Sequence, residues 1–202
     1  MAFVSTYSLL SLLLQYPDAG TLDARGELAR ELEGLPRGPS RDAIAAFLSA
    51  QEAVPRAELR SEYVATFDFD RRASLYLTYH SHGDRRQRGI ELVRLKRRFA
   101  AAGLALADGE LPDYLPALLE FAALAPDGEG AALLAELRPQ LELVRSRLHE
   151  TGSRYAHLLD ALAAALPPLT RAQAERARRL AEQGPPTELV GLEPVAAPEP
   201  AL

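Results

Sequence analysis

The chain has 202 residues, no cysteine and a formal net charge of −5. This length suits one domain, and a hydrophobic content of 48% is enough for a large core, which excludes a globally disordered chain. The absence of cysteine excludes disulfides, cysteine-ligated metals, iron–sulfur clusters and a thiol nucleophile. The acidic balance argues against a dedicated nucleic-acid-binding protein, and the lack of disulfides is compatible with a cytoplasmic location, which we expect.

The N-terminal residues 1–17 contain an apolar run that ends at Tyr16-Pro17. The run has no basic residue before it and no small-residue cleavage site, so we expect no secretory signal. It is also too short to span a bilayer, and no later segment is longer, so we expect no direct membrane insertion. The pattern predicts a buried first helix over about 5–15, because the residue before a proline disfavours helix.

Apolar side chains recur at three- and four-residue spacings along most of the chain, which predicts helices almost throughout. No run alternates in the manner of a strand. Beyond the first helix, we expect helices over about 21–34, 40–51, 55–67, 85–102, 113–122, 134–148, 155–162 and 170–180, with a shorter helical piece over 74–79. The sequence therefore predicts an all-α single domain over 1–183, a bundle of about eight to nine helices.

Residues 184–202 differ from the rest of the chain in composition, with five prolines, three glutamates and no basic residue. This composition predicts a disordered C-terminal tail. Leu189, Val190 and Leu192 are the apolar residues by which the tail could contact a partner or the domain itself. The alternative is a solvated chain end.

Charge is unevenly distributed in the middle of the chain. Residues 71–98 hold nine arginines and lysines against two acids, whereas residues 99–137 hold seven acids and no basic residue. Such blocks can form patches of opposite sign that steer charged partners. Alternatively, they are solvated helix faces that pair with each other, and the arginines of 85–98 are then an ordinary surface helix rather than an anion site.

The segment 80–84 reads His-Ser-His-Gly-Asp, the beginning of a hydrolase-type metal site. His80, His82 and Asp84 would be its ligands. The histidine expected next is replaced by Arg85, and the β-strands that such a site needs are not predicted. We therefore expect no metal, no cofactor and no catalytic residues, with the histidines in a structural turn. A metal-dependent hydrolase using these three residues is the alternative.

Five aromatic residues lie within seventeen positions: Tyr63, Phe67, Phe69, Tyr76 and Tyr79. Helical spacing places Tyr63 and Phe67 on one face, where we expect them in the core. The remaining aromatics exceed what one helix face needs, and tyrosine is enriched at binding surfaces. The surplus indicates an apolar groove that accepts a peptide helix.

Four segments together resemble the delta subunit of respiratory nitrate reductase, the molybdenum cofactor assembly chaperone family called NarJ, within the wider TorD/DmsD-like chaperones. They are YVATFD (63–68), SLYLTY (74–79), HGDRRQRG (82–89) and ELPDYLPALLEF (110–121). They occur in the family's order, and the resemblance extends over about residues 5–165.

The resemblance implies an all-α chaperone that is not an enzyme. It implies binding to the apo catalytic (alpha) subunit of nitrate reductase, notably its N-terminal segment, and assistance with molybdenum cofactor insertion. In the wider family a Pro-Asp-His element contributes to the leader-peptide site, and Pro112-Asp113-Tyr114 occupies that place here. Tyrosine for histidine departs from the wider pattern and leaves any role that needs an imidazole in doubt. A generic helical adaptor without this client is a further alternative, and we expect a monomer or weak dimer.

From the aromatic surplus and the resemblance together we expect one peptide-binding groove. An amphipathic client helix would lie on the apolar side chains, and basic client residues would meet the acidic ones. The expected groove residues are Phe67, Tyr76, Tyr79, His82, Asp84, Asp113, Tyr114, Leu115, Leu119 and Glu120.

Overall fold

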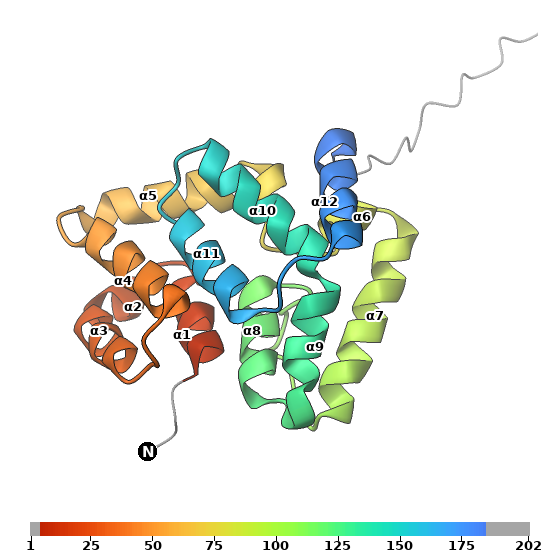
Figure 1. Cartoon of the computed structure of the whole chain (residues 1–202), viewed down its shortest axis with the longest axis horizontal. Helices are drawn as coiled ribbons and strands as arrows, with labels where there is room; N and C mark the ends of the chain where they lie inside the picture. Colours follow the sequence, from red (N-terminus) through yellow and green to blue (C-terminus); the bar gives the residue numbers. More distant parts are fainter. Residues whose placement is uncertain (1–4, 185–202) are drawn as a thin grey trace, which may run out of the picture.

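The computed structural model describes residues 5–184, which contain twelve α-helices and two short 3-10 helices (Figure 1). The all-α class predicted from the sequence is confirmed. The predicted tail, apart from Gly184, lies outside the described residues. The elements are α1 Thr6–Leu13, α2 Ala19–Asp23, α3 Arg25–Glu33, α4 Pro39–Gln51, α5 Arg56–Phe67, η1 Arg71–Ala73, α6 Tyr79–His82, α7 Arg86–Ala101, α8 Leu115–Leu124, η2 Pro126–Gly128, α9 Glu129–Glu136, α10 Arg138–Glu150, α11 Ala156–Ala165 and α12 Arg171–Gln183.

The helix count exceeds the predicted eight to nine because two expected helices are each divided and because a short helix, α6, includes the histidines expected in a turn. The expected helix over 21–34 consists of α2 and α3, and α2 begins earlier than predicted because Asp18, not Thr21, caps it. The expected helix over 134–148 falls in α9 and α10, which meet at Leu137. Pro139 follows at the second position of α10, where a missing N–H costs no helical hydrogen bond.

Two predictions about the segments 74–79 and 110–121 were wrong. Residues 74–78 are not helical: Tyr76 forms an isolated antiparallel bridge with Tyr114. The helix expected over 113–122 begins only at Leu115, with Tyr114 as its N-cap. In contrast, the last helix begins close to the predicted residue 170, because the side chains of Thr170 and Gln173 form a reciprocal capping box at the start of α12.

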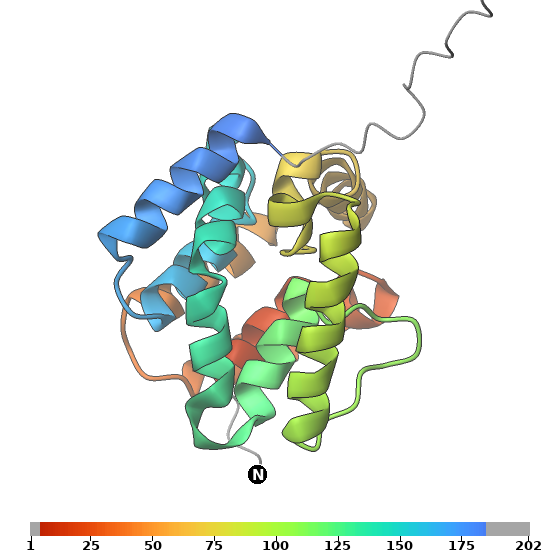
Figure 2. The same ribbon diagram turned by 90° about the vertical axis from the view of Figure 1, so that its right-hand side faces the viewer.

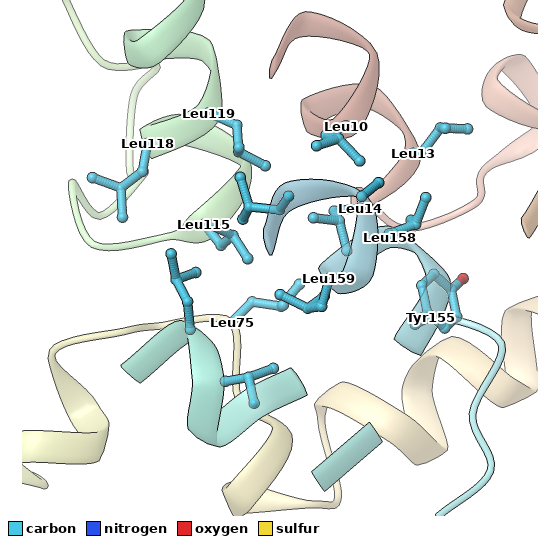
Figure 3. Packing of buried hydrophobic residues seen from close by; sticks show 14 of the residues in the cluster. Leu10, Leu13, Leu14, Leu75, Leu115, Leu118, Leu119, Tyr155, Leu158 and Leu159 are labelled. Atoms are coloured by element: carbon cyan, nitrogen blue, oxygen red, sulfur yellow. The ribbon is translucent and has the colours of Figure 1, made fainter. Parts of the chain in front are cut away.

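The buried apolar residues form one continuous cluster to which most helices contribute. Helix α4 packs along α11, α1 along α8, and α10 along α12. Figure 3 shows Leu10 and Leu14 from α1 near Leu115 from α8 and Leu159 from α11. The Ser11 hydroxyl also donates a hydrogen bond of 2.8 Å to the carbonyl of Pro116, so α1 and α8 are joined by a polar contact within the core.

Helix α7 lies at one side of the molecule, beside the α8–α9 pair (Figures 1 and 2). Its buried side chains are Leu95 and Phe99, and Phe99 packs on Phe121 with ring centroids 4.5 Å apart. Arg98 adds ion pairs to Glu129 and Glu136 on α9. Among residues 5–184, no helix is both long enough and apolar enough to cross a bilayer.

Candidate functional site

The segments 74–79 and 110–121 meet through backbone hydrogen bonds. The Leu77 N–H donates to the Asp113 carbonyl at 3.0 Å, and the Leu115 N–H donates to the Leu75 carbonyl at 2.8 Å. This pairing places Tyr76 opposite Tyr114, and their rings lie 5.2 Å apart between centroids. Two segments far apart in sequence thus contribute one aromatic pair, which is partly open to solvent.

Behind this pair the carboxylate of Asp113 is completely buried. Its Oδ2 atom accepts a short hydrogen bond from the Thr78 hydroxyl and lies 3.3 Å from Nη2 of Arg88. Its Oδ1 atom has no hydrogen-bond partner among the described residues. A buried carboxylate is stable as an ion only when paired, so Arg88 and Asp113 depend on each other.

The guanidinium group of Arg88 also lies over the rings of Tyr76 and Tyr79. Its guanidinium carbon lies 5.8 Å from the ring centroid of Tyr76 and 5.7 Å from that of Tyr79, within the range of cation–π attraction. Its Nη1 atom lies 3.8 Å from Oδ1 of the exposed Asp84. Arg88 therefore joins two tyrosines and two carboxylates.

These groups border an open cavity of about 260 Å³, which we call the aromatic cleft. Its floor and rim combine aromatic, acidic and basic side chains, which suits a ligand that is itself amphipathic. The lining residues are Phe67, Asp68, Arg71, Ser74, Tyr76, Tyr79, Asp84 and Arg88.

Tyr63, Phe67 and Tyr155 form an inner aromatic layer between the cleft and the core. The Tyr63 hydroxyl donates to the Leu14 carbonyl at 3.1 Å and lies 3.1 Å from the Tyr114 hydroxyl. Since the single hydroxyl hydrogen of Tyr63 is given to Leu14, Tyr114 is the donor in the second bond. Phe67 packs on both Tyr63 and Tyr155, with ring centroids 4.8 Å and 4.9 Å away. Tyr63 and Phe67 are buried, as predicted.

Carboxylates surround the exposed tyrosines. Burial raises the pKa of the Tyr76 phenol, and the charges of Asp113 and Glu110 raise it further. Burial also raises the pKa of Tyr114, which Glu110 and Asp68 affect in the same direction. The pKa of Glu110 is raised by its own burial and by the nearby Glu120. The surface beside Tyr114 is therefore acidic, although Arg88 neutralises Asp113 itself.

Comparison with known proteins shows the family to which this chain belongs. A sequence model described as nitrate reductase delta subunit matches residues 35–180, which include all the cleft residues. The chain belongs to the nitrate reductase delta subunit family.

Relatives within this family agree. The chain is 35% identical over 161 residues to the probable nitrate reductase molybdenum cofactor assembly chaperone NarJ of Bacillus subtilis, which covers 80% of this chain and 88% of that protein. It is also 35% identical over 156 residues to the Escherichia coli K12 chaperone NarJ, covering 76% of this chain and 66% of that protein. A third match, 34% identical, is to the nitrate reductase-like protein NarX of Mycobacterium tuberculosis, in which it covers 75% of this chain but 23% of that longer protein.

In this delta subunit family member, six of the ten expected site residues come together. Phe67, Tyr76, Tyr79 and Asp84 line the aromatic cleft, while Tyr114 stacks on Tyr76 and Asp113 lies behind it. Of these six, Phe67 and Asp113 are buried, so neither offers an accessible surface for the direct client contact that we expected. They support the exposed rings instead.

The other four expected residues lie elsewhere. Leu115 and Leu119 are completely buried in the core of α8, so their side chains are closed to a peptide in this conformation. Their stripe is covered by α1, which packs along α8. Glu120 is exposed on α8, and His82 borders a separate cavity between α6, α7, α9, α10 and α12.

The expectation that His80 and His82 lie in a turn was wrong, because both belong to the short helix α6, and their surroundings do not form a metal site. His80 is completely buried, and its Nε2 atom lies 2.8 Å from the Ser74 carbonyl, while Asp84 faces Arg88. Among the residues that the structure describes, no group of three histidine, aspartate or glutamate side chains could hold a metal ion. The geometry gives the hydrolase alternative no support.

Sequence reasoning missed Arg88 and Thr78. Arg88 was one of several arginines in the segment 82–89, and the one available signal was its four-residue spacing from Asp84 on a predicted helix. No pattern among its sequence neighbours indicated a role for Thr78, because its partner Asp113 is thirty-five positions away.

Proposed function

We propose that this protein is a chaperone for the catalytic (alpha) subunit of a respiratory nitrate reductase. It would bind the N-terminal segment of the apo alpha subunit and assist the insertion of the molybdenum cofactor into that subunit. Membership of the delta subunit family, with relatives named as molybdenum cofactor assembly chaperones, supports this function. The single structural observation that carries the proposal is the aromatic cleft, which joins three of the four family-like segments in one partly exposed surface.

The client segment would be an amphipathic helix with basic residues. Its apolar side chains would lie against Tyr76, Tyr79 and Tyr114, which offer ring surface at low entropic cost. Its basic residues would meet Asp68, Asp84 and Glu110. Asp113, which we first expected to contact the client, is already neutralised by Arg88 and holds the two pairing segments together instead.

Release would follow from competition with folding. The proposed segment is accessible in the apo subunit, and its apolar face is covered once the cofactor-containing subunit has folded. Because a ligand shifts a conformational equilibrium only by its differential affinity for the two states, the chaperone would favour the open client until that face is lost.

The binding site is tested by calorimetry with the full chain and a synthetic peptide of the alpha subunit's N-terminal sequence. We expect the double variant Tyr76→Ala, Tyr79→Ala to weaken binding about tenfold or more, since truncating an interface aromatic typically costs more than 1 kcal/mol. Leu124→Ala is the matched control: Leu124 is also exposed, but it lies at the opposite end of α8 from Tyr114. Equal affinity of the two folded variants would overturn the site.

The chaperone function is tested separately by co-expression with the alpha subunit. We expect the subunit purified from cells that lack the chaperone to contain much less molybdenum than the subunit made with it. If molybdenum content is unchanged while peptide binding is retained, the protein is a helical adaptor for this client rather than a cofactor-assembly chaperone.

A further inference from the structure

The outward face of α7 carries apolar side chains that the proposed client site does not use. Ile90 and Val93 are 62% and 52% exposed, on the side of the helix opposite the buried Leu95 and Phe99. With the adjacent small residues they form a shallow, open hollow along this one helix. The lining residues are Arg86, Gly89, Ile90, Val93, Arg94, Arg97, Arg98 and Ala101.

This hollow is strongly basic at its rim. Arg98 is held by Glu129 and Glu136, and Arg94 lies 3.6 Å from Glu91. Within residues 5–184, Arg86 and Arg97 form no ion pair with an acidic side chain. An apolar strip between uncompensated arginines is suited to an apolar segment that carries acidic residues.

The face is separate from the aromatic cleft. The α7 residue that lines the cleft is Arg88, which points toward Asp113 and is only slightly exposed. Arg86, Ile90 and Val93 line the hollow and not the cleft. Occupation of one surface therefore leaves the side chains of the other in place.

The same chain contains a segment of the required chemistry. Residues 185–202 hold three glutamates and no basic residue, and Leu189, Val190 and Leu192 lie between Glu188 and Glu193. The segment follows directly on Gly184, the last described residue after α12. Leu189 and Leu192 follow Gly184 by five and eight positions, so an extended chain carries them about 16–26 Å from it at about 3.3 Å per residue. Helix α12 borders α7, because Arg176 and Arg94 line one cavity, so the α7 face is within this reach.

We propose that residues 185–202 dock in cis on the outward face of α7. Leu189, Val190 and Leu192 cover Ile90 and Val93, and the flanking glutamates pair with the arginines of the rim. Covalent attachment favours this occupant over a free partner, because short linkers give effective concentrations in the millimolar range.

The proposal is tested on the full chain by NMR with a spin label. Because the chain has no cysteine, Ala196→Cys provides a unique attachment site next to the proposed contact. We expect selective broadening of the amide signals of Gly89, Ile90, Val93 and Arg97. The substitutions Leu189→Ser and Leu192→Ser should abolish it, and they fall outside the described fold. Leu202→Ser, the same kind of change beyond the contact, should leave the broadening unchanged.

Charge reversal tests the pairing directly. The double variant Arg94→Glu, Arg97→Glu should lose the broadening, and adding Glu188→Arg and Glu193→Arg should restore it. Both arginines are exposed on the helix surface, so the reversal leaves the core residues intact, and the amide spectrum of the remaining helices checks this.

Three results would overturn the proposal. The first is broadening that persists unchanged in the Leu189→Ser, Leu192→Ser variant. The second is the same broadening in a mixture of isotope-labelled chain without spin label and unlabelled chain with it, which would assign the contact to a second copy. The third is binding of the α7 face to vesicles of anionic phospholipid, combined with no broadening of the α7 signals by the spin label. The α7 face would then be a membrane-binding surface.

Discussion

Arg88 Nη2 lies 3.3 Å from Oδ2 of Asp113, and this ion pair joins the segment 82–89 to the segment 110–121. The aspartate is completely buried and the arginine is mostly so. Arg88 also lies over the rings of Tyr76 and Tyr79, two of the three tyrosines that we propose for client binding. The shape of the aromatic cleft therefore depends on the contact of Arg88 with the buried Asp113.

Removal of Asp113 should destabilise the fold. Asp113→Ala leaves Arg88 and the Thr78 hydroxyl without their buried partner, and breaking a buried pair costs about 3 kcal/mol. The measurement is urea unfolding followed by circular dichroism. Asp84→Ala is the control, because it removes the exposed partner of the same arginine and should cost less than about 1 kcal/mol. Equal losses in the two variants would contradict this account of Asp113.

Gly130 should not tolerate a side chain. It is buried where α9 packs on α8, and a Cβ atom there would overlap the backbone of Ala122. Because backbone atoms cannot move aside as a side chain does, we expect Gly130→Ala to lower the free energy of unfolding by about 3 kcal/mol.

The control for Gly130 is Gly89→Ala within α7, where an added Cβ meets no atom within 4 Å. Alanine is the better helix former, so this variant should be more stable than the parent by about 0.5–1 kcal/mol. Thermal unfolding of the two variants side by side should show shifts of opposite sign. A stabilised Gly130→Ala protein would mean that α8 and α9 separate easily.

His80 should make stability depend on pH. Burial lowers the pKa of its imidazole below the ordinary value of 6.5. As the pH falls below about 6.5, the unfolded chain takes up a proton that the folded chain does not, so the free energy of unfolding decreases until the folded-state pKa is reached. Above that range His80 contributes no pH dependence.

The measurement for His80 is urea unfolding between pH 5 and pH 7.5, a window of about one to two units around 6.5. We expect His80→Gln, which keeps a polar group near the Ser74 carbonyl, to reduce the loss of stability at the acid end. Identical profiles for parent and His80→Gln would disprove the contribution of this imidazole.

The hydroxyl of Tyr63 should stabilise the inner aromatic layer. Tyr63→Phe keeps the ring contacts but removes the hydrogen bond to the Leu14 carbonyl and the acceptor for Tyr114. We expect a loss of about 1–2 kcal/mol in unfolding experiments, since buried groups are left without partners. Tyr16→Phe is the control, because the exposed Tyr16 hydroxyl makes no side-chain hydrogen bond within residues 5–184, and its loss should be negligible.

Local sequence patterns predicted most of the helices because a helix depends on neighbours within four positions. The bounds of α7 illustrate this, because they agree with the predicted range 85–102 within one residue at each end. The same local rules failed at Asp113, whose position before an apolar run is typical of an N-cap. Its carboxylate pairs with Arg88 and Thr78 instead, and no helical spacing reports on partners so distant in sequence.

Only part of the expected site lies together in the structure. Tyr76 and Tyr79 line one cleft, and Tyr114 packs on Tyr76 beside it. Leu115 and Leu119 were expected beside them, and the structure places both in the core. Periodicity identifies an apolar stripe on a helix, but a stripe can face the core or a ligand, and only the packing of α8 on α1 distinguishes the two.

The sequence by itself determined the helical class, the burial of Tyr63 and Phe67, and the family, because these follow from composition, short-range spacing and motifs in a given order. Only the tertiary structure decided which charges are neutralised and which aromatics are exposed. The pairing of Tyr76 with Tyr114 and the contact of Arg88 with Asp113 both join positions far apart in the chain. Their stability comes from burial and low local dielectric, which exist only after the chain has folded.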